Sequence, residues 1–316
     1  MANAANPILL FLSWSGRQGS VLLAVGIFGG ALIPPLAAAF RDFVTPNVLG
    51  MMTLVLLRVD LPGTVAHLKR PVGVAVIVVF QLLVSPVVAA LIVAPLPLDQ
   101  GIADGVVLFA AGCAATSSPA FARMVGLDPE LALIVSLITT ALVPLTAPPM
   151  ALWLMGIDLT ISAGAIMTRL LVVVGFPALL SLALRYAIGP ARLLRWGDAV
   201  DGVLVWLVVF YGFGVMDGLG DRVQADPAWV VTAILAAFIV DYGLNLLTTL
   251  ALQPLGARVA ATAGLMSGNR NMALFLAVLP AATDPRIALF FGLCQFPLFL
   301  SPFLLRPVYR RFPSLV

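Results

Sequence analysis

Long apolar stretches separated by short polar connections make up nearly all of this sequence. A bilayer core of about 30 Å is crossed by a helix of about 20 apolar residues. Ten stretches approach or exceed that length, and we expect one transmembrane helix in each of them. Their approximate bounds are 18–40, 44–58, 72–94, 101–126, 129–155, 163–187, 200–219, 227–250, 254–280 and 285–305. The pattern predicts an all-α integral membrane protein with ten transmembrane helices.

Charged residues are too few to cover the surface of a soluble protein. The chain has 316 residues, of which 62% are hydrophobic and 10% are charged. Soluble domains contain about 25% charged residues. Soluble enzymes and nucleic-acid-binding proteins are therefore excluded as classes, and the lipid bilayer is the expected surrounding. The sequence carries no signal for an oligomeric state.

The basic residues indicate how the chain is oriented in the membrane. With a cytoplasmic N-terminus, the inner side collects Arg17, Arg58, Lys69, Arg70, Arg123, Arg185, Arg192, Arg195, Arg258, Arg306, Arg310 and Arg311. The outer side then keeps Arg41, Arg169, Arg222 and Arg286. Because cytoplasmic loops carry the excess of Lys and Arg, we expect both termini in the cytoplasm. The expected location is a bacterial inner membrane, crossed many times.

Ten spans divide into two sets of five, residues 1–158 and 159–316. An odd number of spans per set makes the second set run inverted, as in many secondary transporters. The fourth span is interrupted at residues 113–119, and the ninth, which is the fourth of its own set, at residues 267–271. Paired interruptions of this kind indicate the binding site of a transporter.

The interruptions contain residues that begin new helices. Ser118 followed by Pro119 predicts an N-cap and a first-turn proline, and Asn269 or Asn271 is a candidate cap in the ninth span. New helix N-termini favour an anion, whereas the preceding C-termini and hydroxyl groups favour a cation. The candidate substrate-binding residues are Thr116, Ser117, Ser118, Asn269, Arg270 and Asn271. The structural alternative is that Ser and Thr bond to their own helix and that Pro merely kinks it.

Two ionisable residues lie deep in apolar sequence, Asp241 in the eighth span and Arg270 in the ninth interruption. A charge at that depth marks a partner, a transport pathway or a ligand. Asp241 and Arg270 are candidates for a direct ion pair. Alternatively, Arg270 binds an anionic substrate or Asp241 carries a proton, which makes both residues candidate coupling residues. Gln81, in the middle of the third span, is a weaker candidate because such glutamines often only join helices.

Catalytic sequence patterns are missing. No HExxH, GxSxG, Walker or dinucleotide-binding glycine pattern occurs, so we expect neither an enzyme nor a bound organic cofactor. An aromatic cluster near the C-terminus is expected to face lipid. It consists of Phe290, Phe291, Phe296, Phe299 and Phe303.

Several short motifs resemble those of one family. They are Gln81 with Pro86 in the third span, the small-residue segment 112–118, the series Ser136, Thr140, Pro144 and Pro148, and the segment 268–271 in place of a Gly-x-Gln-Asn sequence. On these residues the chain resembles the bile acid:sodium symporter family and its bacterial relatives. The resemblance implies two inverted five-helix repeats. It also implies a panel of helices 1, 2, 6 and 7, and a core of helices 3–5 and 8–10 in which helices four and nine cross.

Relatives carry bile acids or other organic anions, usually with sodium. The resemblance therefore implies a secondary transporter of a small organic anion that works by alternating access. By position, Ser118 and Ser136 match hydroxyl ligands of one sodium ion, and Gln81 matches a ligand of a second. Thr116 matches a threonine near the substrate, and Thr140 joins Gln81, Ser118 and Ser136 as a candidate sodium ligand.

The chain departs from the family at the residues that bind sodium. Met266 replaces an acidic residue, Pro119 an asparagine, Ala132 a serine ligand and Arg270 a glutamine. Because an arginine does not lose its charge, we hypothesise that Arg270 stands in for sodium while Asp241 balances it or carries a coupling proton. Sodium-coupled, proton-coupled and uncoupled transport stay open, as does a membrane receptor or scaffold that transports nothing.

Overall fold

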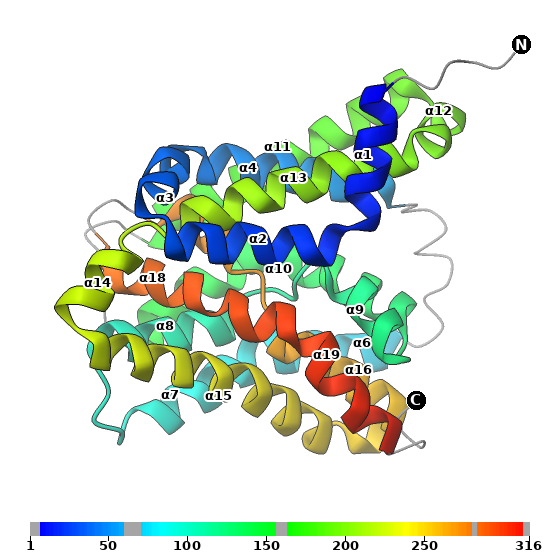
Figure 1. The fold of residues 1–316 in the computed structure, drawn as a ribbon. Helices are drawn as coiled ribbons and strands as arrows, with labels where there is room; N and C mark the ends of the chain where they lie inside the picture. The colour runs from blue at the N-terminus through cyan, green and yellow to red at the C-terminus, as the bar shows by residue number, and fades with distance from the viewer. Residues whose placement is uncertain (1–6, 60–70, 156–162, 280–282, 312–316) are drawn as a thin grey trace, which may run out of the picture. The chain divides into compact units, whose positions relative to one another are not determined.

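The computed structural model describes residues 7–59, 71–155, 163–279 and 283–311 (Figure 1). Helices account for almost all of this described part. The chain divides into two compact units, each built from two separate stretches of sequence. Unit 1 comprises Met1–Val59 and Val172–Ala225, and unit 2 comprises Asp60–Leu171 and Asp226–Val316. The predicted halves 1–158 and 159–316 divide the chain differently and stay a prediction, and their boundary lies outside the described residues.

Seven helical segments in the described residues are long and apolar enough to cross a membrane, so the protein is a multi-pass membrane protein. They are Pro34–Arg58, Pro71–Val93, Pro129–Met155, Gly164–Ile188, Gly197–Ala225, Pro227–Ala251 and Pro285–Arg311. The number ten stays a prediction, because the predicted first, fourth and ninth spans each consist of shorter helices. Lys69 and Arg70, which contribute to the predicted orientation, lie outside the described residues.

Unit 1 is organised around one apolar helix, α13, which packs against α1, α2, α3 and α4. Its elements are α1 (Pro7–Arg17), α2 (Gly19–Leu32), α3 (Pro34–Phe40), η1 (Arg41–Phe43), α4 (Val44–Arg58), the second part of α11 (Ala163–Ile188), α12 (Pro190–Arg195), α13 (Gly197–Val215) and α14 (Leu219–Ala225). Phe40 stacks on Phe210 with 5.0 Å between ring centroids. Arg58 pairs with Asp201 and donates to the Gly197 carbonyl at 2.8 Å, which joins the end of α4 to the start of α13.

Unit 2 contains both interrupted spans. Its elements are α6 (Pro71–Val79), η2 (Phe80–Val84), α7 (Ser85–Val93), α8 (Gln100–Ala111), α9 (Ser118–Val125), α10 (Pro129–Met155), the first part of α11, α15 (Pro227–Ala251), η3 (Gln253–Leu255), α16 (Ala257–Gly268), α17 (Met272–Val278), α18 (Pro285–Leu293) and α19 (Gln295–Arg311). The first three form one continuous span in which η2 is a single π-helical turn.

Acidic caps and one arginine join three helices of unit 2 at one end. Asp99 accepts a hydrogen bond from the Gly101 amide (3.0 Å) at the start of α8, and Asp284 accepts one from the Arg286 amide (2.9 Å) at the start of α18. Arg286 pairs with both carboxylates. The Trp229 indole of α15 donates to Asp99 at 3.0 Å. This ion-pair cluster fixes the ends of α8, α15 and α18 together.

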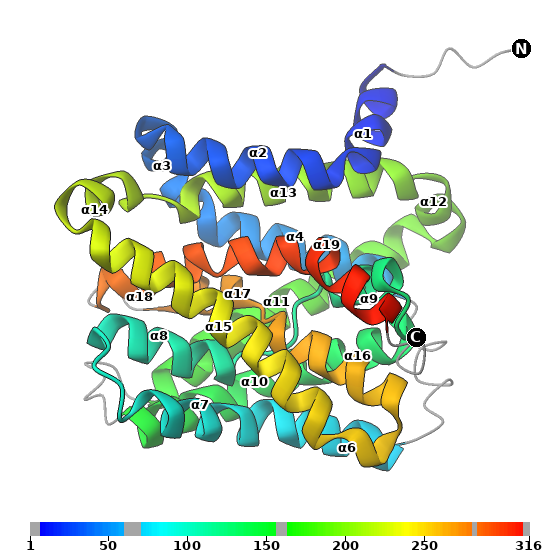
Figure 2. The ribbon, with the colours of Figure 1, turned by 60° about the horizontal axis from the view of Figure 1, so that its bottom comes forward.

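Helices α15 and α16 run side by side as a close-packed hairpin (Figures 1 and 2). The contact depends on two glycines of α16. A Cβ atom at Gly264 would lie 2.5 Å from the Asn245 carbonyl oxygen, and one at Gly268 would lie 2.5 Å from the Asp241 carbonyl oxygen. Small residues let membrane helices approach this closely. The same contact places Asp241 directly against the end of α16.

The expected lipid exposure of the C-terminal aromatic cluster is wrong for two of its members. Phe290 and Phe291 are fully buried, whereas Phe303 is 60% exposed. Phe290 covers Gly105 of α8, where an added Cβ would lie 2.5 Å from the ring. The hydropathy of α18 cannot show which of its faces meets a neighbouring helix, because lipid and protein interior are equally apolar.

We predict that Gly264→Ala destabilises the protein, because the added methyl group meets a backbone carbonyl that cannot rotate away. Overpacking of this kind costs about 1–3 kcal/mol of unfolding free energy. Thermal unfolding of the detergent-purified protein measures the effect. Gly243→Ala in α15 is the matched control, since its Cβ would have no described atom within 4 Å. Equal melting temperatures for the two variants would contradict the packing argument.

Candidate functional site

The fourth predicted span is interrupted as expected, with α8 ending at Ala111 and α9 beginning at Ser118. Gly112 takes an extended backbone conformation and leaves the helix. The N-cap of α9 is Ser117 rather than Ser118, and its side chain caps no amide of the described chain. Pro119 lies in the first turn, where its missing N–H costs nothing. The predicted start of the helix is correct, and the predicted capping residue is wrong by one position.

The ninth predicted span is interrupted in the same way. Helix α16 ends at Gly268 and α17 begins at Met272. Of the two candidate caps, Asn271 occupies the N-cap position without a side-chain cap bond to any described residue. Asn269 instead occupies the position that ends α16.

The two interruptions cross and hydrogen-bond to each other. The Ala115 amide donates to the Asn269 carbonyl at 2.8 Å, and the Asn271 amide donates to the Cys113 carbonyl at 2.9 Å. Ala114 and Arg270 form an isolated antiparallel bridge between these bonds. Backbone that leaves a helix within a membrane has to be satisfied by protein. Each interruption provides the partners that the other one needs.

Two further side chains support the crossing, and sequence analysis missed both. Thr139 of α10 accepts a hydrogen bond from the Ala114 amide at 3.2 Å. Ser301 of α19 donates to the Asn269 side-chain oxygen at 3.1 Å. Both lie in largely apolar parts of their helices, and Thr139 follows the predicted Ser136 by three positions. That spacing puts both on one side of α10 and was the available signal.

Arg270 is buried at the crossing, with 1% of its surface exposed. Its Nε donates to the Ser267 carbonyl at 2.8 Å and its Nη1 donates to the Gly112 carbonyl at 2.6 Å. These carbonyls belong to the carboxyl ends of α16 and α8, where the helix dipole is negative. Its Nη2 has no hydrogen-bond partner among the described residues. The guanidinium thus occupies a cation position between two helix ends.

Asp241 is equally buried, at 1% exposure. Neither carboxyl oxygen has a hydrogen-bond partner in the described part of the chain. No ion pair with Arg270 is present there either, although the two residues interact electrostatically. A Cβ atom at Gly268 would lie 2.7 Å from Asp241 Oδ1, so the carboxyl group lies beside the interruption of the ninth span.

The predicted sodium ligands differ in their burial and in the hydrogen bonds that they make. Gln81 lies in the π-helical turn, and its amide nitrogen donates to the Ala263 carbonyl at 3.3 Å. Ser136 donates back to the Leu133 carbonyl of its own helix at 2.9 Å. Ser118 and Thr140 are buried. All four residues belong to unit 2. The chain has Met266 where the family resemblance implies a carboxylate.

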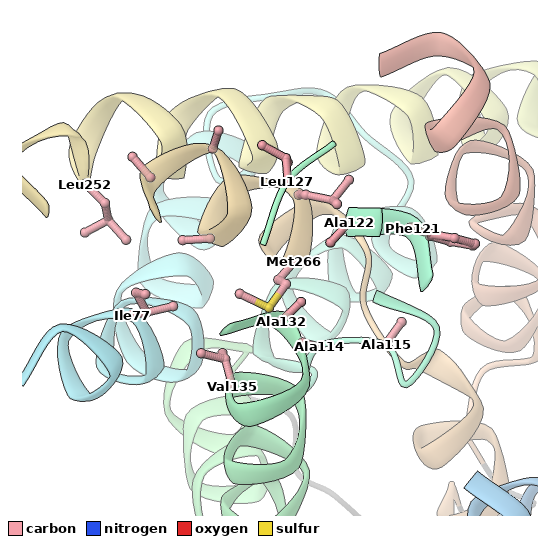
Figure 3. Packing of buried hydrophobic residues seen from close by; sticks show 14 of the residues in the cluster. Ile77, Ala114, Ala115, Phe121, Ala122, Leu127, Ala132, Val135, Leu252 and Met266 are labelled. Atoms are coloured by element: carbon pink, nitrogen blue, oxygen red, sulfur yellow. The ribbon is translucent and has the colours of Figure 1, made fainter. Parts of the chain in front are cut away.

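Apolar atoms occupy the position where the family resemblance implies that carboxylate. Met266 and Ala132 are fully buried and belong to one hydrophobic cluster with Ala114 and Ala115. Figure 3 shows the Met266 side chain directed toward Ala132. Sodium is bound by oxygen atoms of high negative charge, as other hard cations are. A methionine and an alanine do not fit such an ion.

The predicted substrate-binding residues divide into two groups. Thr116, Ser117 and Asn271 are partly exposed, whereas Ser118, Asn269 and Arg270 are buried. The first three side chains are therefore accessible, and Arg270 is the charged member of the buried three.

Residues 45–210 match the family described as the sodium bile acid symporter family. This match covers more than half of the chain. The protein belongs to the sodium bile acid symporter family. Members of this family are transporters rather than enzymes. No curated protein matches the chain. The matched residues of this symporter-family protein include the whole fourth-span interruption and end before Asp241 and Arg270.

We predict that Thr139→Val destabilises the protein by leaving the buried Ala114 amide without its acceptor. An unsatisfied buried donor costs about 1–3 kcal/mol, measurable as a lower midpoint of thermal unfolding in detergent. Thr146→Val on the same helix is the matched control. The Thr146 hydroxyl also donates to a carbonyl four residues back, but it is exposed. An equal effect of both substitutions would show that the contact with Ala114 contributes nothing.

Proposed function

We propose that this protein is a secondary active transporter of a small organic anion that works by alternating access without sodium. The observation that carries the proposal is the Arg270 guanidinium, bonded to the Gly112 and Ser267 carbonyls where the two interrupted spans cross. A permanent positive charge lies where the crossing otherwise offers only neutral polar groups. An anion is the ligand that such a charge attracts.

In this proposal the Arg270 guanidinium takes the place of the sodium ion that relatives bind. Carbonyl groups at two helix ends are natural cation ligands, and here one guanidinium satisfies both. A sodium ion about 4 Å away would be repelled by about 4 kcal/mol at an effective dielectric constant near 20. Met266 and Ala132, in place of oxygen ligands, do nothing to offset that repulsion. We therefore infer that Gln81, Ser118, Ser136 and Thr140 hold no sodium in this protein.

The substrate class follows from charge and exposure. Thr116, Ser117 and Asn271 are partly exposed and offer hydroxyl and amide groups to a ligand. These groups suit one carboxylate or sulfonate, and the apolar surroundings suit a hydrocarbon body. Bile acids, pantoate-like acids, keto acids and sulfonates share this chemistry.

The ten-helix inverted repeat belongs to the same proposal. Its support is the equivalent position of the two interruptions, since α8 and α9 correspond to α16 and α17 in order and in length. Unit 1 holds the residues of the panel implied by the resemblance, and unit 2 holds those of the core. The excess of basic residues in alternate loops supports a bacterial inner membrane with both termini in the cytoplasm.

The proposal predicts that proteoliposomes take up an anion equally well in sodium and in choline buffers. Radiolabelled taurocholate, pantoate and pyruvate are the probes. Arg270→Ala should lower uptake of the transported anion by at least about tenfold, the effect of losing about 1.4 kcal/mol. Arg258→Ala is the control, because Arg258 also donates to carbonyls from α16 but at its exposed end. Steep sodium dependence of the wild-type protein would refute the proposal.

A converse experiment restores the residues that relatives have. We expect the double variant Met266→Glu with Arg270→Gln to bind or transport anions only when sodium is present. The new carboxylate provides the missing ligand, and the glutamine removes the repelling charge. Sodium-dependent thermal stabilisation of the purified variant, compared with wild type, is the measurement. If neither protein responds to sodium, Arg270 does not take the place of the ion.

A non-transporting receptor or scaffold is the second candidate, favoured by the loss of the family's carboxylate. The same probes distinguish it. A receptor would show ligand-induced thermal stabilisation but no flux into proteoliposomes, whereas a transporter shows both.

A further inference from the structure

Asp241 is a buried acidic residue beside the crossing. The sodium-free mechanism proposed above gives it no role. It lies on α15 against Gly268, at the end of α16. Burial of an ionised carboxylate without a hydrogen bond or a counter-ion is among the most costly arrangements in a protein. Both Asp241 oxygens lack a partner among the described residues. These surroundings therefore favour a protonated, neutral Asp241.

Arg270 is the nearby cation, but it does not neutralise Asp241 in this arrangement. Two of its nitrogens donate to the Ser267 and Gly112 carbonyls. The remaining nitrogen, Nη2, is without a partner in the described chain, as are both Asp241 oxygens. If Asp241 is ionised, Arg270 Nη2 is an available hydrogen-bond donor for its carboxylate. If Asp241 is protonated and neutral, it does not need that hydrogen bond.

Two of the three other titratable groups near Asp241 form hydrogen bonds elsewhere. Cys294, Tyr309 and Tyr242 interact with it electrostatically. The Tyr242 hydroxyl donates to the Pro297 carbonyl at 3.2 Å, and the Tyr309 hydroxyl bonds to the Asn245 side chain at 3.3 Å. Cys294 is a buried free thiol.

The remaining charged groups on the packed helices also face away. On α8, Asp104 accepts from Gln100 at 2.8 Å. On α18, Arg286 pairs with Asp99 and Asp284. Arg270 is left as the only charged group in the described chain that interacts electrostatically with Asp241.

We propose that Asp241 is the proton-binding residue that couples this transporter, so that one proton moves with each anion. This inference rests on the proposed function. The Asp241 carboxylate takes one proton from water before the anion binds on one side, and it returns the proton to water after the anion has left on the other. No covalent bond other than that O–H bond forms or breaks.

The charges balance in both forms that have to reorient in the membrane. In the loaded form, the anion neutralises Arg270 while Asp241 is protonated. In the empty form that changes sides, Asp241 has released its proton and its carboxylate neutralises Arg270 through Nη2. Because a net charge in the bilayer is costly, both neutral forms can change sides. A form that holds the anion while Asp241 is ionised has one net negative charge. That charge opposes its movement between the two sides.

Infrared spectroscopy of the purified protein in sodium-free buffer tests the proton directly, without a substrate. We expect a C=O stretching band of a protonated carboxyl group at neutral pH in the wild-type protein and its loss in Asp241→Asn. Asp221→Asn, at an exposed position, is the matched control and should keep the band. Asp241→Glu should keep it at a shifted frequency.

An identical carboxyl band in wild type and in folded Asp241→Asn would overturn the proposal. Loss of the wild-type band on addition of sodium chloride would also overturn it, because Asp241 would then bind sodium. Asparagine has nearly the same shape as aspartic acid, so we expect Asp241→Asn to fold. The melting temperature of each variant checks this.

Transport tests the coupling. Taurocholate is a suitable probe because its sulfonate does not take up a proton itself. A pH difference of one unit, acidic outside, should drive accumulation of up to about tenfold at one proton per anion. Asp241→Asn should lose this accumulation but retain exchange of internal for external taurocholate.

The outcomes separate this inference from the proposed function. Two results would overturn the inference and leave the proposed function standing. One is sodium-independent uptake that does not change with the pH gradient, and the other is accumulation retained in Asp241→Asn. Absence of any flux in the wild-type protein would count against the proposed function. In that case the infrared band still decides whether Asp241 holds a proton.

Discussion

The crossing of two interrupted helices depends on one requirement, the satisfaction of backbone groups where a helix stops inside an apolar chain. Within a membrane no water is available to those groups. Here the Ala115 and Asn271 amides donate to carbonyls in the opposite interruption, and Arg270 donates to the Ser267 and Gly112 carbonyls at the ends of α16 and α8. The contact that makes the interruptions stable thereby also places a positive charge at the centre of unit 2.

In the function proposed here, that charge takes the place of the sodium ion that the family resemblance implies. The family match ends at residue 210, before the residues that depart most from the family. Met266 and Ala132 pack in an apolar cluster where the resemblance implies oxygen ligands. In the proposed mechanism Arg270 supplies a permanent positive charge and Asp241 a charge that can change. Arg270 follows the end of α16 and Asp241 lies on α15, and Gly264 and Gly268 let these two helices pack closely.

The positions of both interruptions could be predicted because Gly, Pro and Asn stand out in an apolar run and act on their own backbone. The partners could not be predicted. Thr139 and Ser301 are recognised as supports only when Ala114 and Asn269 are known to lie beside them. The cap at Ser117 and the burial of Phe290 depend in the same way on neighbours that come from distant parts of the chain.

The sequence by itself determined that the protein crosses a membrane, where its helices break, and that two ionisable residues lie deep in apolar surroundings. These properties are local, since hydropathy and helix-breaking act over a few to about 20 neighbouring residues. Only the tertiary structure decided what the deep charges do. Arg270 bonds to a carbonyl 158 positions away, and Asp241 stands without a partner in the described chain. A hydrogen bond requires two atoms to lie about 3 Å apart, and folding alone brings such distant segments to that distance.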